Sequence, residues 1–239
     1  MVDQTTQLNV KVFADGADME GILRLSADPR ISGFTTNPTL MRKSGISEYE
    51  GFARKILDHV VDLPVSFEVF SDEFDEMARQ ARRIASWGPN VYVKIPITNT
   101  RGESSASLVT QLSTEGLQVN VTALMTVAQV EQMAAALTES PGAVVSVFAG
   151  RVADTGRDPV PHMEQCLAVI ADLPAVELLW ASPREILNVY QADAIGCHII
   201  TVTHDLLTKL PLFGKDLAAY SLETVEMFHG DAAKAGYLL

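Results

Sequence analysis

The chain alternates short apolar segments with longer amphipathic ones along most of its length. The apolar segments are rich in β-branched residues and have the length of buried strands. The longer segments repeat apolar residues at helical spacing. We predict eight strands, at Val10–Ala14, Ile31–Thr35, Pro64–Phe70, Val91–Ile95, Leu117–Thr122, Ala143–Phe148, Val176–Trp180 and His198–Thr201. The clearest helices are predicted at Glu48–Val60, Glu73–Ser86, Thr126–Leu137 and His162–Ala171.

The order of these elements predicts the fold class. Strands that alternate with helices form parallel β-α-β units, and eight of them favour a single (β/α)8 TIM barrel. An open doubly wound sheet is the alternative. The loop Asp15-Gly16-Ala17-Asp18 has one glycine, so it lacks a dinucleotide-binding fingerprint. We expect one domain over residues 1–239, with an extra C-terminal helical tail from about residue 215.

Helix capping adds two local predictions. Asp72 and Ser182 have side chains suited to the cap position of a helix. Pro183 suits the first position of a helix, because its missing N–H would have no partner there. A helix is therefore predicted to begin at Pro183.

Composition excludes several function classes. The net charge of −12 argues against a nucleic acid or an anionic membrane as partner, although a local arginine cluster can still bind a small anion. Cys166 and Cys197 have no metal or redox spacing, which favours a reducing cytoplasm. The five histidines form no close-spaced ligand pair, so we expect no metal. Met1–Leu8 lacks a signal-peptide pattern, and no apolar stretch is long enough to span a bilayer.

One lysine stands inside an apolar strand. In Val91–Ile95, alternation places Lys94 on the face opposite Val93 and Ile95. Lysine is rarely buried unless it is paired or functional. Burial among apolar neighbours favours a neutral amine, and a neutral amine is a nucleophile that can form a Schiff base with a carbonyl. The alternative is a lysine at a strand end that extends to solvent.

Polar residues gather where the predicted strands end, which is where barrel enzymes place their chemistry. In the third strand, Val65 and Phe67 share one face and leave Glu68 on the other. We therefore expect the polar set to face the barrel interior. Each member also has a structural alternative: Glu68 as a charge on an exposed edge, Asn37 as a turn former, and Arg151 and Arg184 as surface ion pairs. The set comprises Asp15, Asn37, Glu68, Lys94, Asn120, Thr122, Arg151, Ser182 and Arg184.

This set contains the groups that a Schiff-base reaction needs. A lysine nucleophile requires a carboxylate to move protons during carbinolamine formation and carbon–carbon cleavage, and Asp15 and Glu68 are the candidates. Thr122 is a candidate to share a water with Glu68. The remaining candidates bind substrate: Asn37 and Asn120 its hydroxyls, and Arg151, Ser182 and Arg184 a phosphate, helped by the helix predicted at Pro183.

In order along nearly the whole chain, these residues resemble the transaldolase family of class I aldolases. The resemblance implies a barrel with Lys94 as the Schiff-base lysine, Asp15 as the principal acid/base, and Glu68 and Thr122 beside a catalytic water. It implies substrate contact by Asn37 and phosphate binding by Arg151, Ser182 and Arg184. Schiff-base chemistry needs no metal, and we expect no cofactor. The motifs are Phe13-Ala14-Asp15, Thr35-Thr36-Asn37-Pro38, Val93-Lys94-Ile95-Pro96, Asn120-Val121-Thr122, Phe148-Ala149-Gly150-Arg151 and Ala181-Ser182-Pro183-Arg184.

Two positions separate the branches of this family. Transaldolases pass a dihydroxyacetone unit between sugar phosphates, and fructose-6-phosphate aldolases release it. Glu68 and Phe148 resemble the transaldolase branch, since the aldolase branch tends to have Gln and Tyr there. The alternatives are an aldolase that uses free dihydroxyacetone and a non-catalytic sugar-phosphate binder. Gly16 departs from the family, because many members have Thr there.

The apolar residues of the C-terminal tail, from about residue 215, indicate self-association. Small members of the resembled family are homo-oligomers in which this tail contacts a neighbour. A free apolar stripe usually packs on something, so we expect a homo-oligomer. The alternative is a tail that folds back on its own barrel. The helix is predicted over Asp216–His229, with an apolar stripe of Leu217, Tyr220, Leu222, Val225, Met227 and Phe228.

Overall fold

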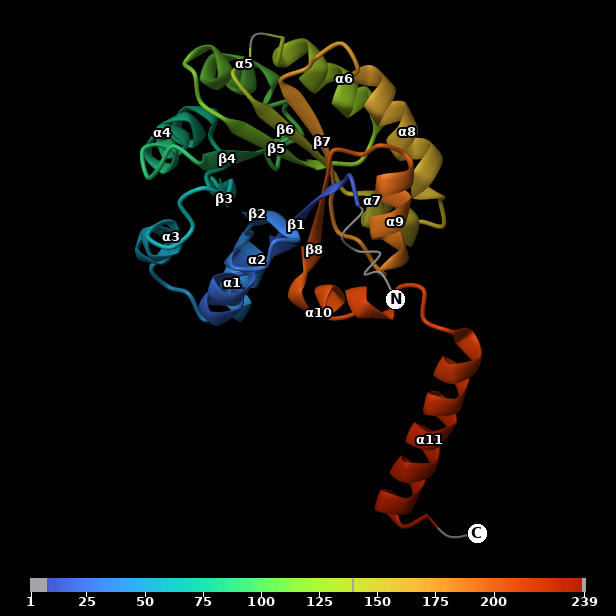
Figure 1. Ribbon diagram of the computed structural model, residues 1–239. Coiled ribbons are helices and arrows are strands. Elements are labelled where there is room, and N and C mark those ends of the chain that lie inside the picture. Colours follow the sequence, from blue (N-terminus) through green and yellow to red (C-terminus); the bar gives the residue numbers. More distant parts are fainter. Residues whose placement is uncertain (1–7, 139, 238–239) are drawn as a thin grey trace.

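The computed structural model describes residues 8–138 and 140–237. The expectation about a signal peptide, which rests on residues 1–7, and the last two tail residues lie outside this part of the chain. Eight parallel strands close into a barrel in chain order, and helices surround it (Figure 1), so the predicted TIM barrel is confirmed. The strands are β1 (Lys11–Asp15), β2 (Ile31–Thr35), β3 (Val65–Glu68), β4 (Val91–Pro96), β5 (Val119–Leu124), β6 (Ala143–Val147), β7 (Val176–Trp180) and β8 (Ile199–Thr203).

The helices follow the strands in the expected alternation. Their N-termini are often fixed by side chains: Thr126 and Gln129 form a capping box at α6, and Asp158 caps α8 three residues earlier than predicted. A short 3₁₀ helix, Leu210–Leu212, precedes the tail. The α-helices are α1 (Met19–Ser26), α2 (Pro38–Lys43), α3 (Tyr49–Leu57), α4 (Phe74–Ala85), α5 (Ala106–Thr114), α6 (Val127–Ala136), α7 (Ala149–Asp154), α8 (Pro159–Val169), α9 (Leu187–Ala194), α10 (His204–Leu207) and α11 (Leu217–Ala235).

Alternate strand residues enter two different cores, as a barrel requires. Val93 and Ile95 are fully buried in the large core that joins the strands to the helices. Phe13, Val144 and Leu179 belong to a separate cluster inside the barrel. Leu179 also lines the cavity at the carboxyl ends of the strands. The interior cluster therefore forms the floor of that cavity.

Strand register brings polar residues to one level. Pairing aligns Glu68 with Lys94 across β3 and β4, and Lys94 with Asn120 across β4 and β5. Asp15 is aligned with Thr35 of β2. Paired residues in neighbouring strands point to the same face of the sheet. The alternation seen in the sequence thus becomes a ring of polar groups inside the barrel.

The predicted cap at Asp72 is wrong. Helix α4 begins at Phe74 and has Glu73 at its cap position, without a side-chain hydrogen bond. The carboxylate of Asp72 instead accepts hydrogen bonds of 2.7 Å from both the backbone N–H and the hydroxyl of Thr100. These two donors from a distant loop compete with the helix end for the same oxygens.

The predicted helix at Pro183 is also wrong, because the next helix begins at Leu187. Ser182 has a φ of +62°, in the left-handed region. The Oδ1 of Asn188 then accepts hydrogen bonds from the backbone N–H of Arg184 and of the next residue. These bonds close a loop in place of a helical turn. Since no helix begins at Pro183, a helix dipole there cannot help to bind a phosphate.

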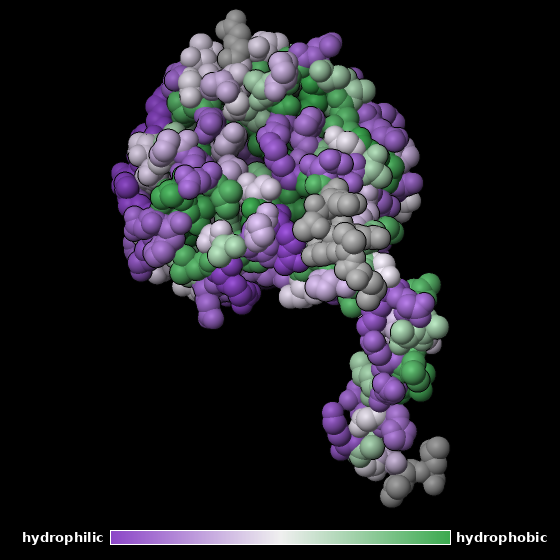
Figure 2. All heavy atoms as spheres, in the orientation of Figure 1, coloured by the Kyte–Doolittle hydropathy of each residue, from purple (hydrophilic) through white to green (hydrophobic). Residues whose placement is uncertain are grey.

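The tail leaves the barrel as a separate arm (Figure 1). Helix α11 is capped by Asp216, and it has no buried residue. Its apolar side chains are open to solvent, with Leu217 80% and Phe228 63% exposed, and Figure 2 shows hydrophobic residues along this arm. The alternative in which the tail folds back on its own barrel is therefore wrong. No helix in the described part of the chain has the length and apolar character needed to cross a membrane.

Candidate active site

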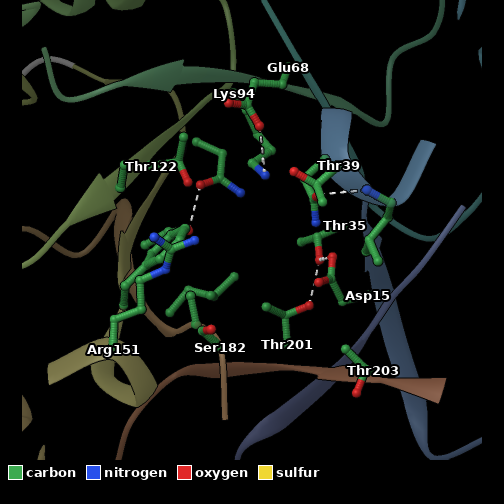
Figure 3. A pocket seen from close by; sticks show the side chains of 18 of the residues that line it. Asp15, Thr35, Thr39, Glu68, Lys94, Thr122, Arg151, Ser182, Thr201 and Thr203 are labelled. Atoms are coloured by element: carbon green, nitrogen blue, oxygen red, sulfur yellow. Dashed lines mark hydrogen bonds and ion pairs between the residues drawn. The ribbon is translucent and has the colours of Figure 1, made fainter. Parts of the chain in front are cut away.

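A cavity of about 590 Å³ opens at the carboxyl ends of the strands, and side chains converge on it (Figure 3). Every predicted site residue lines this cavity, although the residues lie on seven different strands or on the segments that follow them. The geometry brings the whole set together, and the role of each residue stays a prediction. The set is Asp15, Asn37, Glu68, Lys94, Asn120, Thr122, Phe148, Arg151, Ser182 and Arg184.

Lys94 is buried and has polar partners inside the barrel. Its side chain is 8% exposed, so the alternative of a lysine extending to solvent is wrong. Its Nζ lies 3.1 Å from Glu68 Oε2 and donates a 2.8 Å hydrogen bond to the carbonyl of Thr36. Glu68 therefore faces the cavity and is not a charge on an exposed edge. The amine lies among polar partners, whereas the sequence suggested apolar ones.

Asp15 lies across the cavity from this pair. One carboxylate oxygen accepts a 2.7 Å hydrogen bond from Thr35, whose hydroxyl also bonds to that of Thr201. Burial raises the pKa of Asp15, while the charge of Lys94 and the Thr35 hydrogen bond oppose the rise. A raised pKa brings a carboxyl closer to the range in which it can both accept and return a proton.

Behind Asp15, two glycines leave room for the side chain of His204. A Cβ at Gly16 would lie 2.6 Å from His204 Nε2, and one at Gly21 would lie 2.6 Å from His204 Nδ1. The imidazole therefore fills the space that a side chain at position 16 would need. Burial lowers the pKa of His204, which favours a neutral ring beside Asp15.

Asn120 is fixed from two sides. Its amide nitrogen donates a 3.1 Å hydrogen bond to Ser66, and its carbonyl oxygen accepts a 2.6 Å hydrogen bond from Ser146. All three residues are buried. These bonds define the orientation of the Asn120 amide, and they place it next to Lys94 in the strand register.

Asn37 and Thr122 border the same cavity. The Oδ1 of Asn37 accepts a hydrogen bond from Leu40 N–H, so Asn37 caps α2 and Pro38 takes the first helical position. Asn37 therefore has a structural part as a helix cap, whereas its structural alternative was a turn former. Thr122 is buried and pairs with Pro96 at the end of β4.

The opposite side of the cavity is built by loops after β6 and β7. A Cβ at Gly150 would lie 1.5 Å from the Ser182 carbonyl oxygen, so only glycine permits this approach. The contact joins α7, which carries Arg151, to the loop with Ser182 and Arg184. The guanidinium of Arg151 lies 5.2 Å above the centre of the Phe148 ring.

Arg184 has an acidic partner that the sequence analysis did not identify. It forms a bidentate ion pair with Asp154, in which Arg184 Nε lies 2.9 Å from one carboxylate oxygen. Both side chains are about half exposed, and the hydrogen bonds from Arg184 lower the pKa of Asp154. The ion-pair alternative is therefore correct for Arg184. An incoming phosphate would compete with Asp154 for the same donors.

Two further residues that line the cavity, Ser146 and Thr201, were not predicted from the sequence. Ser146 lies between Val145 and Val147 in β6, and this alternation is the same signal that identified Glu68. Thr201 occupies a similar position in β8. No comparable signal marks Asp154, because its partner comes from another loop. Within the described residues, no group of three or more His, Cys, Asp or Glu side chains converges as a metal site would require.

A closed parallel barrel with its polar cavity at this end defines a TIM-barrel enzyme. Solved structures share this fold. Dihydrodipicolinate synthase from Rhodopseudomonas palustris aligns with a TM-score of 0.58 at 16% identity, over 93% of this chain and 79% of that one. An aldolase/citrate lyase family protein from Burkholderia cenocepacia aligns with a TM-score of 0.59 at 14% identity, over 93% and 97% of the two chains.

Sequence comparison identifies the family. The family model described as Transaldolase/Fructose-6-phosphate aldolase matches residues 12–237, and the chain belongs to this family. It is 36% identical over 215 residues to "Probable transaldolase 2" of Listeria monocytogenes, covering 88% of this chain and 94% of that protein. It is 37% identical over 224 residues to "Probable transaldolase" of Streptococcus agalactiae, covering 90% and 95%.

Proposed function

We propose that this protein is a transaldolase that transfers a dihydroxyacetone unit between sugar phosphates through a Schiff base on Lys94. The observation that carries the proposal is the placement of Lys94 Nζ 3.1 Å from Glu68 Oε2, in a cavity that Asp15 also lines. A non-catalytic binder does not require a buried lysine beside carboxylates. Membership of the transaldolase/fructose-6-phosphate aldolase family supports this reaction, and the cavity contains a candidate group for each step.

The proton transfers follow from these positions. The Lys94 amine attacks the ketose carbonyl, and Glu68 helps to remove the hydroxyl of the carbinolamine as water. Asp15 then takes the proton of the C4 hydroxyl as the C3–C4 bond breaks, and an aldehyde leaves. The electron pair of that bond forms the C2=C3 double bond of an enamine, in which the dihydroxyacetone unit stays bound to Lys94. Addition of an acceptor aldehyde and hydrolysis reverse these steps, with Thr122 and Glu68 beside the water.

Two residues support transfer over net cleavage. Glu68 and the phenyl ring of Phe148 border the cavity. The ring has no hydroxyl that would orient a water for hydrolysis of the Lys94 intermediate. The intermediate is then expected to wait for an acceptor. Arg151, Ser182 and Arg184 would bind the phosphate of donor and acceptor in turn, so the two substrates are expected to compete.

The test is trapping with borohydride in the presence of a ketose phosphate. We expect a reduced adduct on the Lys94 peptide by mass mapping, and no adduct on that peptide in Lys94→Met. Lys43 also lines the cavity, so Lys43→Met is the matched control and is expected to keep the adduct. An adduct on Lys43 would refute the assignment. Turnover that is equally fast with and without an aldose phosphate acceptor would make the protein an aldolase.

The exposed tail supports a second proposal, that the protein is a homo-oligomer. None of the apolar residues of α11 is buried against the described part of its own chain. Light scattering at micromolar concentration should give a mass above that of one chain. Replacing Val225 and Phe228 together by Glu should reduce it, whereas Glu226→Gln should not. A wild-type mass equal to a single chain would refute the proposal.

A further inference from the structure

The backbone around Glu68 has an unusual hydrogen-bond partner. Strands β2 and β3 pair through only two residue pairs, Phe34 with Val65 and Thr35 with Ser66. The last backbone bond between them runs from Thr36 N–H to the Ser66 carbonyl, at 3.2 Å. In a parallel ladder the next bond would run from the N–H of Glu68 to the carbonyl of Thr36. In the structure, the N–H of Glu68 donates to a side chain instead.

The hydroxyl of Tyr49 takes the place of the missing strand residue. It accepts a 2.8 Å hydrogen bond from Glu68 N–H and donates a 2.8 Å hydrogen bond to the Glu68 carbonyl. The Thr36 carbonyl is thereby left to accept the hydrogen bond from Lys94 Nζ. The Tyr49 hydroxyl thus satisfies both backbone groups of Glu68, and it leaves the Thr36 carbonyl available to Lys94.

Aromatic packing holds the Tyr49 ring in place. Its centroid lies 5.3 Å from that of Phe70, 5.8 Å from that of Trp87 and 6.4 Å from that of Phe67. Burial raises the pKa of Tyr49, which keeps the hydroxyl neutral and able to donate. The ring is therefore fixed independently of the two hydrogen bonds that its hydroxyl makes.

We propose that Tyr49 is a positioning residue for the Schiff-base reaction. Its hydroxyl sets the backbone of Glu68 so that the carboxylate reaches Lys94, and it leaves the Thr36 carbonyl to orient the amine. This inference rests on the proposed function, since it assigns Tyr49 a role in that reaction. Without the hydroxyl, the Glu68 N–H turns to Thr36 and competes with Lys94 for its carbonyl.

The test is Tyr49→Phe, which keeps the ring and removes the hydroxyl. A small misplacement of catalytic groups can lower a rate by about 10²-fold, and we expect kcat to fall roughly tenfold to a hundredfold with KM nearly unchanged. The matched control is Trp87→Phe, which alters the same aromatic cluster without touching Glu68. We expect the control to keep near-native kcat. An equal loss in Trp87→Phe would mean that packing alone is responsible.

A double-mutant cycle separates positioning from general destabilisation. If Tyr49 acts through Glu68, Tyr49→Phe should cost much less in a Glu68→Gln background, because coupled residues are not additive. Equal fold losses in both backgrounds would refute the inference. Amide hydrogen exchange of the wild type adds a test that needs no variant. Strong protection of Glu68 N–H is expected, and exchange at the rate of an exposed strand end would refute the contact.

Failure of this inference can be told apart from failure of the proposed function. A wild type that forms no adduct on Lys94 with any ketose phosphate overturns the proposed function, and the inference with it. A wild type that forms the adduct and turns over, but shows additive losses in the cycle, overturns the role of Tyr49 alone.

Discussion

The two sides of the cavity hold their charged groups in opposite ways. On the proton side, defined by Asp15, Glu68 and Lys94, the residues lie on strands, and the Lys94 and Glu68 side chains are only 8% and 19% exposed. On the phosphate side, defined by Arg151, Ser182 and Arg184, the residues follow β6 and β7. The Arg184 side chain is 47% exposed and paired with an acid.

This difference suits the two tasks that we propose for these residues. Groups that move protons must be fixed before the substrate arrives, because their geometry decides the barrier. Groups that capture a phosphate must be reachable from solvent and must exchange one anionic partner for another. The barrel thus combines a preorganised interior with an exchangeable rim. The predictions below test whether the two sides act as separately as their construction indicates.

The largest effect is expected on the proton side. Asp15→Asn should lower kcat by about 10²–10⁴-fold, the usual contribution of a positioned acid/base group. KM for a phosphorylated donor should change little, because Asp15 does not belong to the phosphate side. Steady-state kinetics check both values. Near-native turnover in both Asp15→Asn and Glu68→Gln would contradict the mechanism.

The same variant has an expected signature in stability. Burial raises the pKa of Asp15 above its ordinary 3.8, so the folded protein binds this proton more tightly than the unfolded one. That stabilisation is complete below pH 3.8 and is lost as the pH rises through the folded pKa. Asp15→Asn should therefore gain stability over the wild type towards neutral pH. Urea unfolding from acid to neutral pH measures the difference, and a constant difference would contradict it.

The next effect is expected on the phosphate side. Hydrogen bonds to charged groups contribute roughly 1.5–3 kcal/mol, so Arg184→Ala should raise KM for phosphorylated substrates by about tenfold to a hundredfold. Unphosphorylated substrates should be nearly unaffected. Asp154→Asn is the matched variant, because it removes the competing carboxylate and should lower KM for phosphorylated substrates. An equal loss for both substrate types in Arg184→Ala would make that residue structural.

The smallest effect concerns Phe148, which directly follows β6 and lies under the guanidinium of Arg151. Phe148→Tyr adds a hydroxyl that can orient a water, and one hydrogen bond of about 0.5–1.5 kcal/mol would speed acceptor-free release of dihydroxyacetone roughly twofold to tenfold. Phe148→Leu is the control, because it alters the packing under Arg151 without adding a donor. The measurement is release with and without acceptor. Equal release in both variants would contradict the role of the hydroxyl.

Most of the barrel could be predicted from local patterns. Alternation within Val65–Glu68 and Val119–Leu124 gave both the strands and the direction of Glu68 and Asn120, because side chains alternate faces in any strand. Such signals are contained within a few residues. They identify which side chains enter the barrel, and strand register then brings them together.

The remaining features depend on contacts between distant segments. Asp72 has a side chain suited to a helix cap, yet its carboxylate accepts hydrogen bonds from Thr100. Ser182 and Pro183 are residue types that often begin a helix, yet the hydrogen bond from Arg184 N–H to Asn188 closes a loop there. The bonds from Tyr49 to the backbone of Glu68 have no signature in either local segment. Capping rules describe what a side chain can do, and tertiary structure decides which partner it meets.

The contact between Gly16 and His204 links two positions that are far apart in the chain. The imidazole occupies the volume that a Thr at position 16 would need. A Thr at position 16 therefore requires a smaller or displaced residue at 204. Through evolution the two positions are expected to co-vary, and a relative with Thr at the position of Gly16 should carry a compact residue after its eighth strand. In this protein, Thr at position 16 alone would clash with His204 beside Asp15, and a smaller residue at position 204 alone would leave an empty space there.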